Sequence, residues 1–158
     1  MTEASSDNLS NLLHETRTFP PSPDFAAQAN VTEDAYAAAA ADRLGFWEEQ
    51  ARRLTWRSPW TQALEWDAPD AKWFVGGTLN VAENCVVRHV AAGLGDRVAI
   101  HWVGEPEGDT RAITYAQLLD EVKRAANALT DLGVRAGDRV AIYLPMLPET
   151  VVAMLACA

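Results

Sequence analysis

A short phrase that occurs twice is the feature that most constrains this chain. Gly95 to Ile100 reads GDRVAI, and the same six letters return at Gly137 to Ile142. Each copy opens with a turn-forming Gly-Asp pair and continues into an apolar run typical of a strand. The stretch between the copies has the period of an amphipathic helix. Strand, helix and strand in this order predict an α/β unit whose two strands run parallel.

The helix between the copies has clear start and stop signals. Thr114 can cap it, Gln117 stands at the capping-box position, and Gly133 is a natural C-terminal stop. If its apolar stripe packs, we expect Leu129→Ala to cost about 2–5 kcal/mol. The predicted stripe is Tyr115, Leu118, Leu119, Val122, Ala126, Leu129 and Leu132.

Strands are predicted on both sides of this helix. Residues 97–103 form a strand, residues 104–109 an acidic turn and residues 111–114 a short returning strand, which together make a hairpin. The turn carries carboxylates without metal-ligand spacing, so we interpret it as a solvated loop. Residues 140–144 are nearly unbroken in apolar character, which predicts a strand covered on both faces.

The final segment is apolar up to the last residue. Pro148 suits a first helical turn, and Glu149 complements the dipole there. Residues 151–158 then form an apolar helix with no cap or turn signal after it. We therefore expect an incomplete domain, the front of a longer protein. Alone it would be unstable, or would self-associate through its exposed apolar surface.

The N-terminal part divides into a tail and a helix. Residues 1–29 are predicted to be disordered, because prolines at 20, 21 and 23 break any helix. A single helix is expected from Asn30, which can cap it with Glu33 three residues later, to Leu54. Its continuous stripe would be Tyr36, Ala40, Leu44, Trp47, Ala51 and Leu54.

The next stretch is rich in tryptophan. Trp56, Trp60, Trp66 and Trp73 are spaced irregularly among charged residues and prolines. We interpret this as a loop-rich segment pinned to a larger body by aromatic anchors. A stacking platform for nucleic-acid bases is the alternative, and the net charge of −9 argues against it because a phosphate backbone would be repelled.

One more helix is predicted before the first copy of the repeated phrase. Asn80 caps it, Glu83 occupies the third position, and it runs to about Ala91 before Gly93 and Gly95 end it. Its apolar side would consist of Val81, Cys85, Val86 and His89.

Composition sets wide limits. With 158 residues and 49% hydrophobic content, the chain can form a domain with a real core. No apolar run approaches the roughly 18 residues of a membrane span, and no secretory signal is visible at the start. These features predict a cytoplasmic protein without a membrane or nucleic-acid partner.

No catalytic constellation is visible. The three histidines, His14, His89 and His101, stand in unrelated contexts, and a structural role is the expectation for His89. Cys85 and Cys157 are expected to be buried free thiols. The glycines around residue 94 lack the third glycine of a dinucleotide fingerprint, which argues against a small nucleotide-binding domain.

Three stretches nevertheless carry a resemblance. They are residues 42–47 with the tryptophan-rich segment after them, WFVGGTLNVAENCVVRH at 73–89, and residues 113–158. Together they resemble the N-terminal part of the AMP-forming acetyl-CoA synthetases, within the adenylate-forming superfamily. By this resemblance, residues 30–94 would be the helical, loop-rich extension, and residues 95–158 the truncated start of the large AMP-binding domain.

The resemblance implies an activity for the longer protein. Acetate, ATP and CoA would give acetyl-CoA, AMP and pyrophosphate through acetyl-adenylate, with Mg²⁺ offsetting phosphate charge. The family's catalytic motifs lie beyond Ala158, so no catalytic, cofactor-binding or metal-binding residue is assigned. The chain alone would be inactive, would bind none of these ligands and would meet its substrates through the rest of the enzyme.

Other functions stay open. The family usually has an aromatic residue where Glu83 stands and an acid where Val87 stands, and residues 82–84 are similar to the acetoacetyl-CoA synthetases. A segment of a propionyl- or acetoacetyl-CoA synthetase is therefore an alternative. A non-catalytic, standalone interaction module that uses its tryptophan surface is another.

Overall fold

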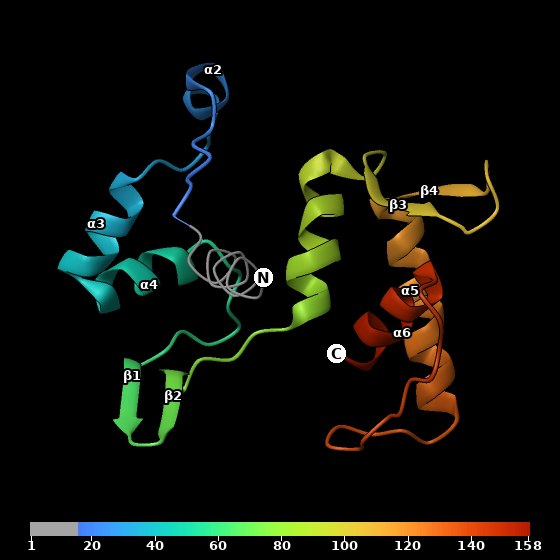
Figure 1. The fold of residues 1–158 in the computed structure, drawn as a ribbon. Coiled ribbons are helices and arrows are strands. Elements are labelled where there is room, and N and C mark those ends of the chain that lie inside the picture. The colour runs from blue at the N-terminus through green and yellow to red at the C-terminus, as the bar shows by residue number, and fades with distance from the viewer. Residues whose placement is uncertain (1–15) are drawn as a thin grey trace, which may run out of the picture. The chain divides into compact units, whose positions relative to one another are not determined.

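The structure is a computed structural model of the chain, and it describes residues 16–158. The chain divides into two compact units, one up to Arg43 and one from Leu44 to Ala158 (Figure 1). Most of the predicted tail, including His14, lies outside the described residues.

From residue 16 onward, the N-terminal unit contains two short helices, α2 (Pro23–Ala27) and α3 (Asp34–Ala41). The prediction that the chain is disordered around Pro23 is therefore wrong. Proline suits the first helical position, because the N–H that it lacks has no partner there. Ser22 completes the start, since its hydroxyl accepts a hydrogen bond from the backbone N–H of Phe25 at 3.4 Å. Neither helix has a buried residue.

The single helix predicted over residues 30–54 is interrupted. Its first helical segment follows Glu33 and not Asn30, and it ends at Asp42, whose φ of −144° and ψ of 88° are not helical. Helix α4 (Arg43–Ala51) begins at the next residue. A long helix depends on packing of its stripe, and Tyr36 in this stripe is 80% exposed. Because α3 has no buried residue, its packing does not favour one continuous helix through Asp42.

An antiparallel hairpin occupies part of the segment predicted to be loop-rich. Strand β1 (Gln62–Asp67) pairs with β2 (Asp70–Val75), with Leu64 opposite Trp73. The alternation that signals a half-buried strand is weak here, because Ala63 is the one buried residue of the described pair. The prediction of loops missed the hairpin for that reason.

A second antiparallel hairpin confirms the prediction for residues 97–114. Strand β3 (Val98–Val103) pairs with β4 (Thr110–Thr114), and Val103 lies opposite Thr110 across the acidic turn. Helix α5 (Tyr115–Asp131) follows without a gap.

The capping box of α5 is present as predicted. The Gln117 N–H donates to Thr114 Oγ1 at 3.2 Å, and the Gln117 side chain accepts from the Thr114 N–H at 2.9 Å. Gly133 has a φ of +90°, which suits a residue just after a helix. The predicted stripe holds for the first turns, whereas Leu129 is only half-buried and Leu132 is 81% exposed.

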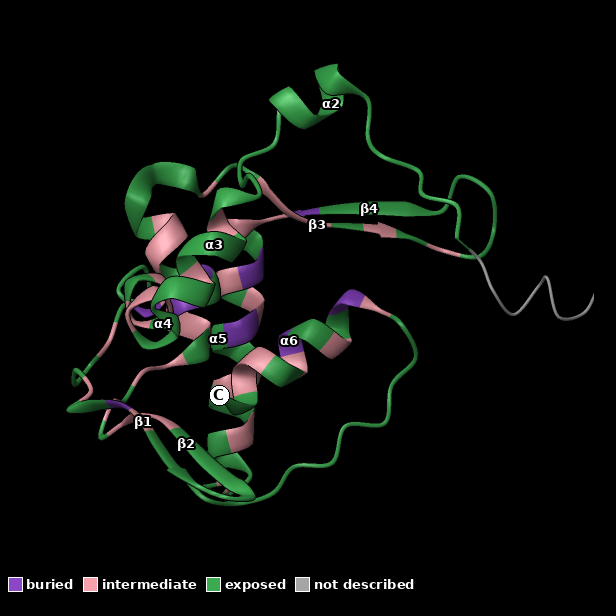
Figure 2. Ribbon diagram, turned by 60° about the vertical axis from the view of Figure 1, so that its left-hand side comes forward, coloured by how far each residue is buried: buried purple, intermediate pink, exposed green. Residues whose placement is uncertain are grey.

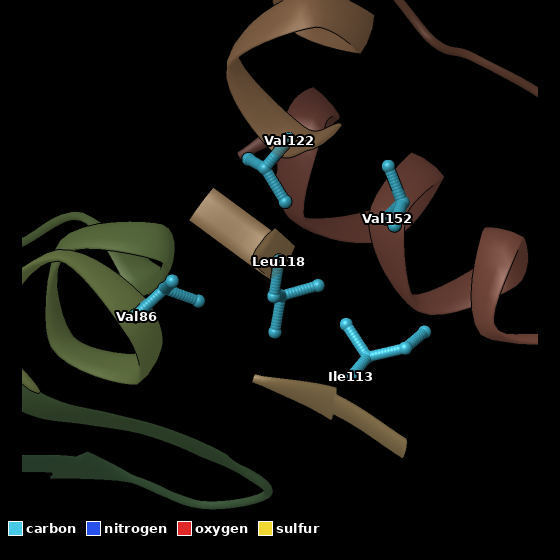
Figure 3. Close-up of a cluster of buried hydrophobic side chains, with 5 residues drawn as sticks. All are labelled: Val86, Ile113, Leu118, Val122 and Val152. Atoms are coloured by element: carbon cyan, nitrogen blue, oxygen red, sulfur yellow. The ribbon is translucent and has the colours of Figure 1, made fainter. Parts of the chain in front are cut away.

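Helix α6 (Pro148–Cys157) closes the core of the second unit. It packs against α5, and Figure 2 shows buried positions on these two helices and their neighbours. The five buried side chains come from four separate elements (Figure 3): Val86, Ile113, Leu118, Val122 and Val152.

The second predicted strand is absent. Residues 140–144 lie in the loop that joins α5 to α6 (Figure 2), and the two sheets of the described part are both two-stranded and antiparallel. Tyr143 is 101% exposed. A strand is stabilised by hydrogen bonds to a neighbour, and no strand of residues 16–158 lies beside this run. The mixed helix-and-strand character is confirmed, and the parallel pair is not.

Candidate functional site

The helix after Asn80 is wider than an α-helix. Asn80 caps it as predicted, since its Oδ1 accepts the N–H of Glu83 at 2.8 Å. Two stretches, η1 (Glu83–Val87) and η2 (Val90–Leu94), have the π-helical pattern, in which a backbone N–H donates to the carbonyl five residues earlier. Gly93, inside η2, departs from helical geometry with a φ of +81°, and Gly95 follows the last residue of η2.

The wider turn changes which side chains face inward. Asn84 is 7% exposed and Val86 is 1% exposed, whereas Val81 is 49% exposed and Cys85 is exposed. The apolar side predicted for an ordinary α-helix is therefore wrong at Val81 and Cys85. A π-helical turn contains more residues than an α-helical turn, so it shifts the inward positions along the sequence.

Asn84 joins this helix to the segment that follows α4. Its Oδ1 accepts the Thr55 N–H at 2.8 Å, and its Nδ2 donates to the Thr55 carbonyl at 2.9 Å. The same Nδ2 also lies 3.1 Å from the Asn80 carbonyl oxygen. A buried polar side chain is tolerated when its hydrogen bonds are made, and this one is well satisfied.

Aromatic rings join α4 to the β1–β2 hairpin. The ring centroids of Trp56 and Trp60 are 5.0 Å apart, and Phe74 lies 5.7 Å from the first and 5.3 Å from the second, all edge-on. The indole N–H of Trp56 donates to the Ala51 carbonyl at 2.8 Å, and that of Trp60 donates to Glu48 Oε1 at 3.0 Å. Trp56 and Trp60 thus act as anchors within this unit, whereas the same prediction is wrong for Trp66, which is 64% exposed.

The backbone around these rings is constrained. Phe74 has a φ of +53°, a conformation that costs a bulky residue about 1–3 kcal/mol. Gly77 lies so close to Trp56 that a Cβ atom there would be 2.5 Å from the indole Cζ3. Such strain is retained where the surrounding contacts hold it.

These elements line a cavity of about 710 Å³ that is open to solvent, which we call the aromatic hollow. Its lining comes from α4 and the turn after it, from the end of the hairpin and from the wide helix. Cavities of this size with mainly apolar walls and a few polar groups are typical of binding sites. The lining residues are Trp47, Gln50, Ala51, Arg53, Leu54, Trp56, Phe74, Leu79 and Arg88.

Two arginines give the hollow its charge. Arg88 Nη1 donates to the Arg53 carbonyl at 2.9 Å and lies 3.4 Å from Asn84 Oδ1. The Arg53 guanidinium donates to Gln50 Oε1 at 2.9 Å. Neither arginine has a carboxylate partner among residues 16–158. The sequence analysis did not identify this site, because 35 residues separate Arg53 from Arg88 and no local pattern brings them together.

The described histidines and cysteines do not form a common site. His89 lies against Tyr115, with ring centroids 5.0 Å apart, while His101 is exposed on β3. Cys85 and Cys157 are free but exposed, so the prediction of buried thiols is wrong. Cys85 turns outward on the wide helix, and Cys157 lies at the last, exposed turn of α6.

Within the described range, no three histidine, cysteine, aspartate or glutamate side chains gather closely enough to hold a metal ion. The donor set of residues 16–158 therefore does not fit Mg²⁺. No helix in that range combines the length and apolarity needed to cross a bilayer.

Comparison with known families covers most of the chain. Residues 32–85 match the family described as acetyl-coenzyme A synthetase N-terminus, and residues 87–158 match the AMP-binding enzyme family. An acetyl-coenzyme A synthetase of Mycolicibacterium smegmatis is 70% identical over 141 residues, which are 89% of this chain and 15% of the relative. An acetyl-coenzyme A synthetase of Streptomyces avermitilis is 68% identical over 155 residues, which are 98% of this chain and 24% of the relative.

A solved structure gives a similar result. Acetoacetyl-CoA synthetase from Streptomyces lividans matches with a TM-score of 0.71 and 32% identity, over 86% of this chain and 24% of that one. The chain thus spans about a quarter or less of the length of these proteins. By its two consecutive matches and its identity to these relatives, the chain belongs to the acetyl-coenzyme A synthetase family of AMP-binding enzymes and corresponds to the family's N-terminal part.

Proposed function

We propose that this chain supplies the N-terminal region of an AMP-forming acetate–CoA ligase. The observation that carries the proposal is that the two family matches, residues 32–85 and 87–158, follow one another along the chain and are joined by side-chain hydrogen bonds. Arg88 of the AMP-binding match donates a hydrogen bond to the Arg53 carbonyl at 2.9 Å, and Asn80 of the N-terminal match donates one to the Ala158 carbonyl at 2.7 Å. The two matched segments are therefore parts of one folded body.

The reaction proposed for the whole enzyme has two steps. A carboxylate oxygen of acetate attacks the α-phosphorus of ATP, which gives acetyl-AMP and releases pyrophosphate. The CoA sulfur, after losing its proton, attacks the acetyl carbonyl carbon, and AMP leaves. We assign neither step to a residue of this chain, whose proposed part is structural, and we expect no activity from it alone. Mg²⁺ stays a prediction for the whole enzyme.

A chimera tests the proposal. This chain replaces the matched 155 residues of the Streptomyces avermitilis relative, and acetate-dependent pyrophosphate release is measured with and without CoA. We expect activity within about tenfold of the unmodified relative, since 68% identity preserves the buried contacts. A folded chimera without acetate-dependent release would contradict the proposal.

A segment of an acetoacetyl-CoA synthetase is the second candidate, and the Streptomyces lividans structure is the observation that favours it. The same chain placed in that protein distinguishes the two. We expect the acetoacetyl-CoA synthetase host to lose most of its activity, because this chain is only 32% identical to the segment that it would replace. Better function in this host than in the acetyl-CoA synthetase would reverse the assignment.

The remaining expectations stay predictions. A propionyl-CoA synthetase segment is tested by adding propionate to both hosts. A standalone interaction module would be favoured by a sharp thermal melt of the isolated chain together with two inactive chimeras. The absence of nucleic-acid and membrane partners, the cytoplasmic location and self-association each need their own measurement, and size-exclusion chromatography at several concentrations addresses the last.

A further inference from the structure

We propose that the aromatic hollow is a docking site for a polypeptide segment that carries an apolar side chain next to a carboxylate. The segment would come from the part of the ligase that this chain does not match, so the inference rests on the proposed function. It goes beyond that function by naming the surface, and the chemistry, through which the N-terminal region joins the rest.

The walls of the hollow leave large apolar side chains uncovered. Trp47 is 46% exposed and Leu54 is 41% exposed, although both stand beside the buried Ala51. Exposed apolar area of this kind, framed by polar groups, marks a place where another surface packs. The side chain of a docked segment would replace water against these two residues.

The charge of the hollow selects the partner. Arg53 and Arg88 place two positive charges at its wall, in a chain whose net charge is −9. Arginines in such a position commonly pair with carboxylates, which they hold with two parallel hydrogen bonds. Both have only neutral acceptors among residues 16–158. The carboxylate of an aspartate or glutamate from the docked segment would form an ion pair with these arginines.

The comparisons indicate where such a segment comes from. About three quarters of the Streptomyces avermitilis relative has no counterpart in this chain, since the match covers 24% of it. An apolar and cationic surface in a family with so much further sequence fits an internal docking partner.

Thiol labelling in the chimera tests this directly. Leu54→Cys is introduced into the chimera with the Streptomyces avermitilis relative, and its reaction with iodoacetamide is followed at that residue by peptide mass spectrometry. The rate is divided by that of the same site in the denatured chimera. We expect protection of at least about tenfold, because a docked segment shields the thiol until it opens.

Arg52→Cys is the matched control. Arg52 is the neighbour of Arg53, but its side chain is 63% exposed and pairs with Glu48 at 3.2 Å on α4 itself, and it does not line the hollow. We expect this site to react at close to its denatured rate. Equal and fast reaction of both sites in a folded chimera would overturn the proposal.

Charge reversal tests the carboxylate. Arg53→Glu, combined with Leu54→Cys, should remove most of the protection, whereas Arg52→Glu should leave it. Protection that survives Arg53→Glu would refute the acidic partner. The function and the docking site fail separately: an inactive chimera with a protected Leu54→Cys contradicts the function alone, and an active one with an unprotected site contradicts the docking site alone.

Discussion

Arg111 and Glu149 form a two-pronged ion pair, with Nη1–Oε1 at 2.7 Å and Nη2–Oε2 at 3.1 Å, that joins β4 to the first turn of α6. The Arg111 guanidinium also lies 4.6 Å from the ring centroid of Trp102 on β3. The Trp102 indole N–H donates to the Met146 carbonyl at 2.8 Å. These contacts hold the start of α6 against the hairpin.

The ion pair predicts a pH dependence. The hydrogen bond from Arg111 lowers the pKa of Glu149 below its ordinary value of 4.5. The stabilisation is therefore complete above that value, and it is lost as the pH falls through the lower pKa of the folded state. The thermal midpoint, followed by circular dichroism, should fall less on acidification in Glu149→Gln than in the unmodified chain. Both side chains are partly exposed, so the difference will be modest.

Asp120→Asn is the control for that experiment. Asp120 pairs with Arg124 within α5, and both side chains are 70% exposed. We expect its acid profile to follow that of the unmodified chain. Identical acid profiles for Glu149→Gln and Asp120→Asn would show that the Arg111–Glu149 ion pair does not contribute to stability.

Burial along α5 predicts a graded series. Leu118 is 4% exposed and lies in the core, so Leu118→Ala should lower the free energy of unfolding by about 2–5 kcal/mol. Leu129 is half-buried, so Leu129→Ala should lower the free energy of unfolding by less than the roughly 2–5 kcal/mol expected from the sequence. Leu132 is exposed, so Leu132→Ala should change it by no more than about 0.5 kcal/mol. Urea unfolding of the chimera measures all three. A flat series would mean that α5 does not pack as the structure shows.

Asn84 predicts a penalty that size alone does not explain. Asn84→Leu keeps the branching of the side chain but removes its hydrogen bonds to the N–H and carbonyl of Thr55. Thr55 itself is exposed, so water can replace part of these bonds, and we expect a cost of about 0.5–1.5 kcal/mol for each. Asn127→Leu, at an exposed position of α5, is the control. If the two variants unfold at the same urea concentration, the hydrogen bonds of Asn84 to Thr55, in the segment after α4, do not contribute to stability.

Gly77 predicts a steric effect on the tryptophans. Gly77→Ala would place a Cβ 2.5 Å from Trp56 and 3.0 Å from the Phe74 carbonyl oxygen, so the indole must move. Gly95→Ala would meet its nearest atom at 3.6 Å, which is ordinary contact. Near-ultraviolet circular dichroism should change for Gly77→Ala and not for Gly95→Ala. An unchanged spectrum for both would mean that the ring cluster is looser than described.

Local signals in the sequence were reliable where a few neighbouring residues decide the outcome. The Thr114–Gln117 capping box, the Asn80 cap and the glycine stop at 133 all occur as predicted, because each depends on groups within one turn of chain. The π-helical geometry after Asn80 was missed. In this geometry Asn84 and Val86 contact segments that are distant in the sequence, and no local pattern indicates those contacts.

The aromatic hollow had no local signature. Its walls come from α4, the β1–β2 hairpin and the wide helix, and only folding brings Arg53 to Arg88. Even the tryptophans, which were visible in the sequence, gave no indication that they would contact one another.

The repeated phrase GDRVAI separates the two kinds of information. The sequence by itself determined family membership, the caps at Asn80 and Thr114, and the apolar character of both copies. Only tertiary structure decided which copy becomes a strand: in the first, Ile100 faces Ile113 across a hairpin, while the second runs unpaired through a loop. The physical reason is that a strand exists through its hydrogen-bonded neighbour, and no six-residue sequence carries its neighbour with it.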